Sequence, residues 1–195
     1  MSTSNEAYHH GSLREGLVAA GMEALDGPDG KEVSLRELAR KVGVSPTAVY
    51  RHFPDKQALV EALASEGLAM LGAAQAEAAA KVGGGALGFA ETGRAYVRFA
   101  LAHPALFRLM YTQGNPVEHD VSGDPAGRLL QKMTRDLSGN TDDADRLALQ
   151  AWSIAHGIAM LMLDGRIPAD DALIDRLLNT ENLFRLQGRS KEESP

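Results

Sequence analysis

Apolar side chains recur along this chain every three to four positions, with polar and charged side chains between them. Alanine, leucine, glutamate, arginine and methionine dominate these periodic segments, and runs of alternating β-branched residues are scarce. A repeat of this length puts the apolar positions on one face of an α-helix, whereas a strand needs strict alternation. The pattern therefore predicts an all-α protein.

Capping residues, glycines and prolines set the bounds of the predicted helices. Ser12 with Glu15, and Ser34 with Glu37, have the spacing of capping boxes at helix starts. Gly43 ends the second helix, and the triple glycine at 83–85 interrupts the second half of the chain. The predicted helices are 12–25, 34–42, 45–52, 55–82, 86–103, 104–113, 125–137, 142–163 and 170–187.

The segment 34–56 has the layout of a helix-turn-helix, two short helices joined by a tight turn. The close crossing of two such helices needs a small residue, Ala39, and the turn needs a residue that tolerates positive φ, Gly43. Val49 supplies the apolar side of the second helix. In DNA-binding proteins the second helix of this unit enters the major groove. An ordinary helical hairpin with the same small residues is the alternative.

The second helix of this unit and its flanks carry side chains suited to DNA. Hydroxyl and methyl groups at its start suit base edges, and the aromatic and basic groups that follow suit phosphates. A lysine in the first turn of the next helix adds a cation beside backbone amides. Each residue taken alone is also explained as a solvated surface residue, so the prediction rests on the set. The candidate DNA-binding residues are Arg36, Ser45, Thr47, Ala48, Tyr50, Arg51, His52 and Lys56.

Charge is distributed unevenly along the chain. The formal net charge is -6, from 20 basic and 26 acidic residues, which argues against a protein that coats nucleic acid by bulk attraction. Segment 34–56 carries five basic and two acidic residues, net +3, and the chain from 57 onward carries 13 basic and 18 acidic residues, net -5. A basic segment on an acidic body suits a protein that contacts DNA at one end.

The segment 8–63 resembles the N-terminal DNA-binding domain of the TetR family of transcriptional regulators. The resemblance rests on YHHGSLRE at 8–15 and on GVSPTAVYRHFPDKQALVEAL at 43–63. Four residues stand at the family's usual positions: Tyr50, His52, Phe53 and Lys56. The resemblance implies a three-helix DNA-binding domain and a long linking helix into a helical ligand-binding and dimerisation domain. Most such proteins repress genes and release DNA when a small molecule binds.

These features divide the chain into three predicted parts. A DNA-binding domain covers 1–56, a ligand-binding and dimerisation domain covers 57–187, and a disordered tail covers 188–195. A polar loop is predicted over 113–123. The pair His9–His10 is either part of an arm near the operator backbone or an inert terminus.

In the C-terminal part, Trp152, His156 and Gly157 form the pattern W-x-x-x-H-G, which resembles the WHG type of C-terminal domain. The first two residues lie one helical turn apart and share a face. They either line a ligand pocket or form part of the core, with the histidine bonded to a neighbouring carbonyl. The candidate ligand-binding residues are Phe99, His103, Phe107, Met110, Tyr111, Trp152 and His156. The methionines Met110, Met160 and Met162 suit either an adaptable pocket or core filling.

The resemblance also implies a homodimer. Two-fold pairing would place two recognition helices on half-sites about one DNA turn apart. The implied interface is a four-helix arrangement from helices 142–163 and 170–187 of each subunit. Its predicted apolar seam is Leu173, Ile174, Leu177, Leu178 and Phe184.

Enzyme chemistry finds little support in the sequence. The chain has no cysteine, so thiolate metal sites and a cysteine nucleophile are excluded. The glycines at 83–85 lack the lysine and hydroxyl of a phosphate loop, and Ser153 with His156 lacks a third orienting group. We therefore expect no catalytic activity, no cofactor and no metal. A protein-interaction or ligand-storage module with a vestigial DNA-binding domain is the remaining rival.

The sequence predicts a sequence-specific transcriptional regulator, and the resemblance implies a repressor. The expected partners are a palindromic double-stranded DNA operator and an unidentified small-molecule effector. No stretch has signal-peptide length, and no segment approaches a span of about 18 apolar residues. A cytoplasmic protein without a membrane partner is therefore expected.

Overall fold

The computed structural model describes residues 10–27, 33–112, 123–139 and 141–179, and all the regular elements within these ranges are α-helices. In chain order they are α1 (His10–Leu25), α2 (Leu35–Val42), α3 (Pro46–Tyr50), α4 (Lys56–Lys81), α5 (Gly85–Ala102), α6 (Pro104–Thr112), α7 (Pro125–Ser138), α8 (Thr141–Leu163) and α9 (Asp171–Leu177). The prediction of an all-α protein is confirmed for this part of the chain.

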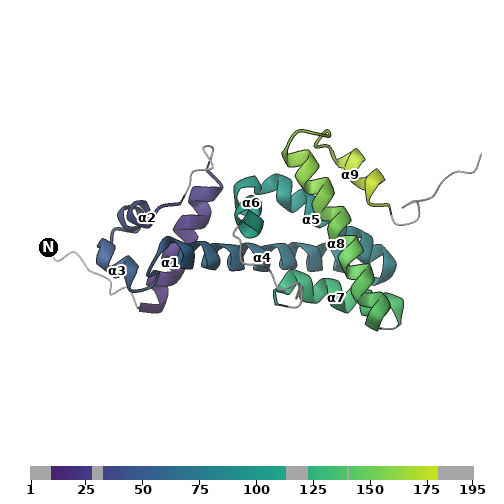
Figure 1. Ribbon diagram of the computed structural model, residues 1–195, viewed down its shortest axis with the longest axis horizontal. Coiled ribbons are helices and arrows are strands. Elements are labelled where there is room, and N and C mark those ends of the chain that lie inside the picture. The colour runs from purple at the N-terminus through teal and green to yellow at the C-terminus, as the bar shows by residue number, and fades with distance from the viewer. Residues whose placement is uncertain (1–9, 28–32, 113–122, 140, 180–195) are drawn as a thin grey trace, which may run out of the picture.

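Helix α4 is the axis of the molecule. It is 26 residues long, and the small bundle of α1, α2 and α3 gathers around its N-terminal end (Figure 1). Helices α5, α6 and α7 pack against its remaining length, α8 packs on α5 and α7, and α9 lies at the edge against α5. One helix therefore belongs to both the N-terminal bundle and the larger helical body.

The N-terminal bundle has its own apolar core. Its innermost side chains come from all four helices that meet there and are at most 2% exposed: Leu17, Leu38, Ala39, Val49, Phe53, Leu59 and Leu63. Helix α1 approaches α4 closely, because a Cβ atom on Gly21 would lie only 2.8 Å from the Leu63 side chain. This packing fixes α2 and α3 relative to the start of α4.

Most predicted helix bounds are confirmed to within one or two residues, and two differences have local causes. The first helix begins at His10, so Ser12 lies inside it and the predicted capping box is wrong. Serine and glutamate cost little in a helix interior, and their spacing alone does not mark a helix start. Ser34 does occupy the N-cap of α2, although its side chain makes no capping hydrogen bond.

Helix α9 ends at Leu177, well before the predicted end at 187. The side chain of Asn179 offers the backbone local hydrogen bonds that compete with a helix, which explains the early end. The predicted continuation over 180–187 and the predicted tail over 188–195 lie outside the described residues. The same is true of His9 and of the predicted loop, except for Gly123.

Glycine at position 72 allows the start of α7 to lie directly on α4. A Cβ atom at this position would come within 2.9 Å of the Ala126 nitrogen and 3.0 Å of the Pro125 carbonyl carbon. These are backbone atoms, so neither can rotate away as a side-chain end would. The contact between α4 and α7 therefore depends on the absence of a side chain at Gly72.

We expect Gly72→Ala to lower the free energy of unfolding by about 1–3 kcal/mol, because the added methyl group forces the two helices apart. Thermal and urea denaturation monitored by circular dichroism would measure the loss. Gly93→Ala in α5 is the matched control, since its Cβ atom would meet Leu178 at an ordinary 3.7 Å. The control should be neutral or slightly stabilising, and an equal loss in both variants would contradict the close-approach explanation.

Candidate DNA-binding surface and ligand cavity

The short helix α3 is held in place from its inner side and from both ends. Gly43 adopts φ 77° in the left-handed region, and the nitrogen of Val44 donates to the Ala39 carbonyl at 2.9 Å. The Ser45 hydroxyl caps α3 by accepting from the Ala48 nitrogen at 3.2 Å. Val49 is fully buried beneath the helix. The predicted turn and cap are thus confirmed, and the outer face of α3 is left to solvent.

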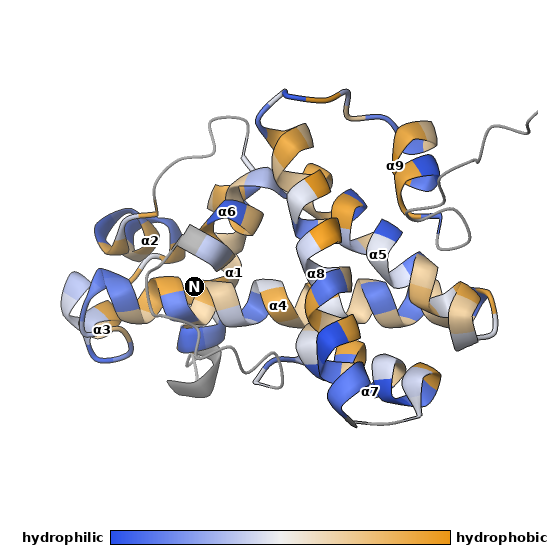
Figure 2. Cartoon of the chain, turned by 45° about the vertical axis from the view of Figure 1, so that its right-hand side comes forward, coloured by the Kyte–Doolittle hydropathy of each residue, from blue (hydrophilic) through white to orange (hydrophobic). Residues whose placement is uncertain are grey.

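The predicted DNA-binding residues lie on α2, on α3 and its C-terminal flank, and at the start of α4. Ala48 and His52 are half-buried, and the other six are exposed: Arg36, Ser45, Thr47, Tyr50, Arg51 and Lys56. Hydrophilic positions cover much of α2 and α3 at this end of the molecule (Figure 2). The structure therefore brings these residues to one end of the protein, with exposed polar and cationic side chains.

Two further cations in this region differ in their surroundings. Lys41 forms an ion pair with Glu23 at 2.7 Å, which ties α2 to α1. Arg14 on α1 lies over the Phe53 ring, 5.3 Å from its centroid, and remains exposed. Arg14 was missed by the sequence analysis, and the cation–π contact that places it beside α3 joins residues far apart in the chain.

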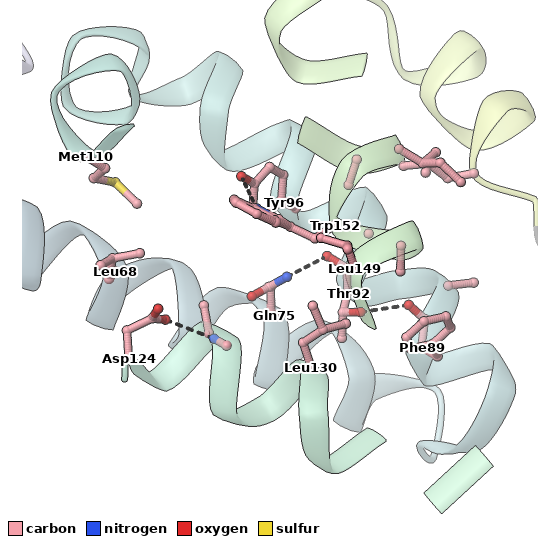
Figure 3. A pocket seen from close by; sticks show the side chains of 18 of the residues that line it. Leu68, Gln75, Phe89, Thr92, Tyr96, Met110, Asp124, Leu130, Leu149 and Trp152 are labelled. Carbon is pink, nitrogen blue, oxygen red and sulfur yellow. Dashed lines mark hydrogen bonds between the residues drawn. The ribbon is translucent and has the colours of Figure 1, made fainter. Parts of the chain in front are cut away.

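The helical body contains a cavity of about 210 Å³ between α4, α5, α6, α7 and α8 (Figure 3). Its wall is mainly apolar and aromatic, with side chains that include Leu68, Phe89, Tyr96 and Trp152. A few polar groups interrupt this lining. That combination is typical of small-molecule sites.

Three of the seven predicted ligand-binding residues line this cavity: Met110, Tyr111 and Trp152. The other four do not, because packing directs them elsewhere. Phe107 is fully buried behind the wall. His103 turns towards α1 and bonds Asp26 at 3.0 Å, and the Phe99 ring lies against it, with centroids 4.9 Å apart.

His156 forms a hydrogen-bonded cluster with two residues of the wall, the buried Tyr96 and the half-buried Trp152, and is itself half-buried. The Trp152 Nε1 group donates to the Tyr96 hydroxyl oxygen at 3.2 Å, and that hydroxyl lies 2.9 Å from His156 Nδ1. The indole can only donate, so the Tyr96 proton is free to be donated to Nδ1. His156 is thus a half-buried histidine whose Nδ1 atom has a hydrogen-bond partner, and that partner is a phenol rather than the predicted carbonyl.

Burial keeps this cluster uncharged. It raises the pKa of Tyr96 and raises the pKa of Tyr111 to about 12. Burial also lowers the pKa of His156, because it disfavours the imidazolium form. The neutral imidazole is the form that accepts the Tyr96 proton, so the hydrogen bonds and the charge states agree.

Sequence analysis missed the polar residues of the cavity. Gln75 of α4, Thr92 of α5 and Asp124 before α7 all line it. Gln75 interrupts an otherwise apolar, alanine-rich stretch of its helix, which is a usable signal in retrospect. Asp124 could be identified as a helix cap from the proline that follows, but its place at the cavity depends on the packing of α7 against α4.

The methionines divide between the two predicted roles. Met110 lines the cavity and rests on Gly67 of α4, where a Cβ atom would lie 2.7 Å from its sulfur. Met162 is a core residue at 4% exposure, and Met160 packs partly buried against the core. Within the described residues, no cluster of three or more His, Cys, Asp or Glu side chains could hold a metal ion.

The predicted seam of the dimer is only partly available. Ile174 and Leu178 are 1% and 7% exposed and pack inside the subunit, and Leu178 also lines the cavity. Arg98 pairs with Asp171 at 2.7 Å and with Asp175 at 3.1 Å, which fastens α9 to α5. The seam prediction is therefore wrong for Ile174 and Leu178, because both side chains pack against the rest of their own subunit. Leu173 and Leu177 are half-buried, and Phe184 lies outside the described residues.

The outer face of α8 is the more exposed apolar surface. On this face Leu161 is 46% exposed and a Cβ atom on Gly157 would meet nothing within 4 Å, whereas Leu149, which is 53% exposed, also lines the cavity. The second half of the helix is hydrophobic (Figure 2). By length and composition alone, residues 142–163 pass as a membrane span, with mean hydropathy 1.2 and 22% burial, so the expectation that no segment approaches a span was too strict. One such helix is weak support for a membrane span, since core helices pass the same test.

The fold and the two sites define a helix-turn-helix DNA-binding regulator with a cavity-bearing helical body. Two family models match the chain: "Bacterial regulatory proteins, tetR family" over residues 17–63 and "Tetracyclin repressor-like, C-terminal domain" over residues 89–180. The second match contains Trp152, His156 and Gly157. The chain belongs to the TetR family and is a transcriptional regulator with a DNA-binding domain.

Similar proteins agree with this assignment. A solved structure of a protein with unknown function from Rhodococcus sp. RHA1 is 37% identical, with a TM-score of 0.72 over 90% of this chain and 96% of that chain. The uncharacterized HTH-type transcriptional regulator YobS of Bacillus subtilis is 24% identical over 86% of this chain and 87% of its own length. The nucleoid occlusion factor SlmA of Marinobacter nauticus is 42% identical over 52 residues, 27% of either chain.

We expect the stability of the protein to fall as pH drops below the unfolded-state histidine pKa of about 6.5. The folded pKa of His156 is lowered, so below that pH the unfolded chain binds more protons and gains free energy relative to the folded state. The loss should stop once pH passes the folded pKa. Urea denaturation at a series of pH values would measure it.

His156→Asn isolates this contribution, because the asparagine amide oxygen can still accept from Tyr96 and does not titrate. The variant should show a flatter dependence of stability on pH than the wild type in this range. Identical pH profiles for the two proteins would contradict the assignment of His156 as a half-buried neutral histidine.

Proposed function

We propose that this protein is a repressor that binds a palindromic operator as a homodimer and leaves the operator when a small molecule enters the cavity. One observation carries the proposal: α4 packs beside the helix-turn-helix at its start and supplies Leu68 and Gln75 to the cavity wall further along. A ligand in the cavity therefore touches the same rigid element that positions the recognition helix.

The proposed docking puts the N-terminal end of α3 in the major groove. Ser45, Thr47 and Ala48 then face base edges, with hydroxyls for polar contacts and methyl groups for thymine. The residues assigned to phosphates are Tyr50, Arg51, His52 and Lys56, and Arg36 is assigned to either the DNA backbone or a base. Exposure of the polar and cationic groups at this end supports the assignment.

The homodimer is proposed to form through the outer face of α8. A helix of this hydropathy with little burial in one subunit suits an interface, and Gly157 would let a partner helix approach closely. The half-buried Leu173 and Leu177 of α9 are available to extend the same surface. Pairing would place the two α3 helices on successive turns of DNA, which a single short helix needs for affinity.

Release is proposed to act through α4. A bound ligand would press on Leu68 and Gln75 directly and on Gly67 through Met110. Tilting α4 would change the separation of the two recognition helices in the dimer. Such coupling requires that the ligand bind the DNA-free conformation more tightly than the DNA-bound one, and by the same factor DNA must weaken ligand binding.

The proposal also covers the domain bounds, the cellular compartment and the absence of a catalytic role. The DNA-binding domain is assigned to 1–56 and the ligand-binding and dimerisation domain to 57–187, with the boundary inside α4. The protein acts in the cytoplasm, where its operator lies, and has no catalytic role. A storage module with a vestigial DNA-binding domain is disfavoured, because exposed cations and hydroxyls are retained on α2 and α3.

We expect Arg51→Ala to weaken binding to all duplex sequences and to reduce the slope of log affinity against log salt by about one. The reason is that one fewer phosphate contact releases about one fewer counterion. Fluorescence anisotropy of a labelled duplex over a salt series would measure both. Arg135→Ala removes the same charge from α7, at the other end of the molecule (Figure 1). Equal effects of both variants would indicate that DNA binding depends on the net charge of the protein and not on a defined surface.

We expect Leu161→Glu to convert the dimer to a monomer, because it places a charge in the proposed α8 interface. Sedimentation velocity would show the change in mass, and affinity for a palindromic duplex should fall with it. Leu87→Glu is the matched control, since Leu87 is 69% exposed on α5 and lies outside this face. A dimer that survives Leu161→Glu would place the interface elsewhere.

A further inference from the structure

Gln75 presents a buried hydrogen-bond acceptor that no group in the described part of the chain satisfies. Its side chain is 7% exposed, and its Nε2 group donates to the Thr92 carbonyl at 3.1 Å. A carbonyl can only accept, so this bond fixes the amide with its oxygen on the opposite side. Oε1 has no partner among the described residues. An unsatisfied buried acceptor costs about 1–3 kcal/mol, so a binding partner from outside would recover that cost.

Gln75 lines the cavity. In Figure 3 the Oε1 end of Gln75 points towards the side of the cavity on which Asp124 lies. Asp124 caps α7 with one carboxylate oxygen, Oδ1, which accepts from the Gly127 nitrogen at 2.9 Å. Its side chain is half-buried, and it also lines the cavity. Two acceptors, one of them charged, therefore lie on one side of an otherwise apolar space.

Two hydroxyl groups that line the cavity are already engaged within the protein. The Thr92 hydroxyl donates to the Phe89 carbonyl at 2.7 Å, and the Tyr96 hydroxyl is held between Trp152 and His156. The Tyr111 hydroxyl interacts with Tyr96. None of the described residues that line the cavity is a lysine, arginine or histidine. An anion would thus face a carboxylate and an amide oxygen with no cation to pair with it.

Four aromatic rings complete the wall: Phe89, Tyr96, Tyr111 and Trp152. The faces of such rings attract cations, most strongly where water is excluded. An apolar cavity of about 150 Å³ is known to hold benzene. The 210 Å³ here leaves room for one aromatic ring with short substituents.

We propose that the cavity binds a small lipophilic amine in its protonated form, with the ammonium group donating to Gln75 Oε1 beside the Asp124 carboxylate and the apolar body against the aromatic wall. This assignment rests on the proposed function only in that the cavity is its effector site. It adds the chemical class of the effector: cationic, donor-bearing and about one ring in size.

Three probes distinguish a cationic ligand from a neutral and an anionic one, because they share a para-ethylphenyl group and differ in the polar group. They are para-ethylbenzylammonium, para-ethylbenzyl alcohol and para-ethylbenzoate. Trp152 is the one tryptophan of the chain and lines the cavity, so its fluorescence reports occupancy. We expect the ammonium probe to bind at least about tenfold more tightly than the alcohol, since hydrogen bonds to charged groups are the stronger ones. The carboxylate should bind most weakly.

Two variants assign the effect to its two groups. Gln75→Leu should weaken the ammonium and the alcohol probes alike by about tenfold, because it removes the unsatisfied oxygen, together with the hydrogen bond that Nε2 donates to the Thr92 carbonyl. Asp124→Asn keeps an N-cap and removes the charge, so it should weaken the ammonium probe alone. Asp170→Asn is the matched control, because Asp170 caps α9 in the same way at 2.8 Å and does not line the cavity.

The inference is overturned if the carboxylate binds as tightly as the ammonium probe, if Gln75→Leu leaves binding unchanged, or if no probe alters the Trp152 emission. These titrations contain no DNA, so their failure leaves the proposed repressor untouched. If the ammonium probe binds as expected and yet leaves the affinity for operator DNA unchanged, the inference stands and the proposed release mechanism fails.

Discussion

The packing of α4 into two cores at once is the constraint on which the rest of the structure depends. Its first turns bury Leu59 and Leu63 beside α1, and a Cβ atom on Gly21 would lie 2.8 Å from Leu63. Further along, Gly72 lets the start of α7 lie against its backbone. Interiors packed this closely transmit displacement instead of absorbing it. A helix held in this way can act as a lever between a DNA-binding surface and a cavity.

Cationic groups and hydrogen-bond acceptors lie near opposite ends of α4. Exposed cations lie on α2, α3 and the start of α4, where phosphates would meet them. The cavity instead offers acceptors, an amide oxygen and a carboxylate, inside a wall of uncharged aromatic groups. Burial keeps Tyr96 and Tyr111 of that wall neutral, and it also disfavours the charged form of His156 beside them. The two ends of the protein therefore suit ligands of opposite charge, DNA at one and a small cation at the other.

The sequence predicted local structure well and the cavity poorly, for a physical reason. The turn at Gly43 and the cap at Ser45 depend on residues a few positions apart, and both are confirmed. The cavity depends on how helices α4 to α8 meet, which periodicity does not report. His103 has a side chain that suits a ligand pocket, yet it forms a hydrogen bond with Asp26 at the end of α1. The apolar Ile174 suited a dimer seam equally well, but it is buried within its own subunit.

Selection of bound sequences from a random duplex pool, followed by affinity measurements over a range of salt concentrations, tests the central claim most directly. The account predicts a palindromic site with half-sites about one DNA turn apart, bound in the range of about 10⁻⁸–10⁻¹¹ M and far above random DNA. Weak binding with a steep salt dependence and no consensus sequence would contradict it. The helix-turn-helix would then be a structural unit, and the cavity would be the place to look for function.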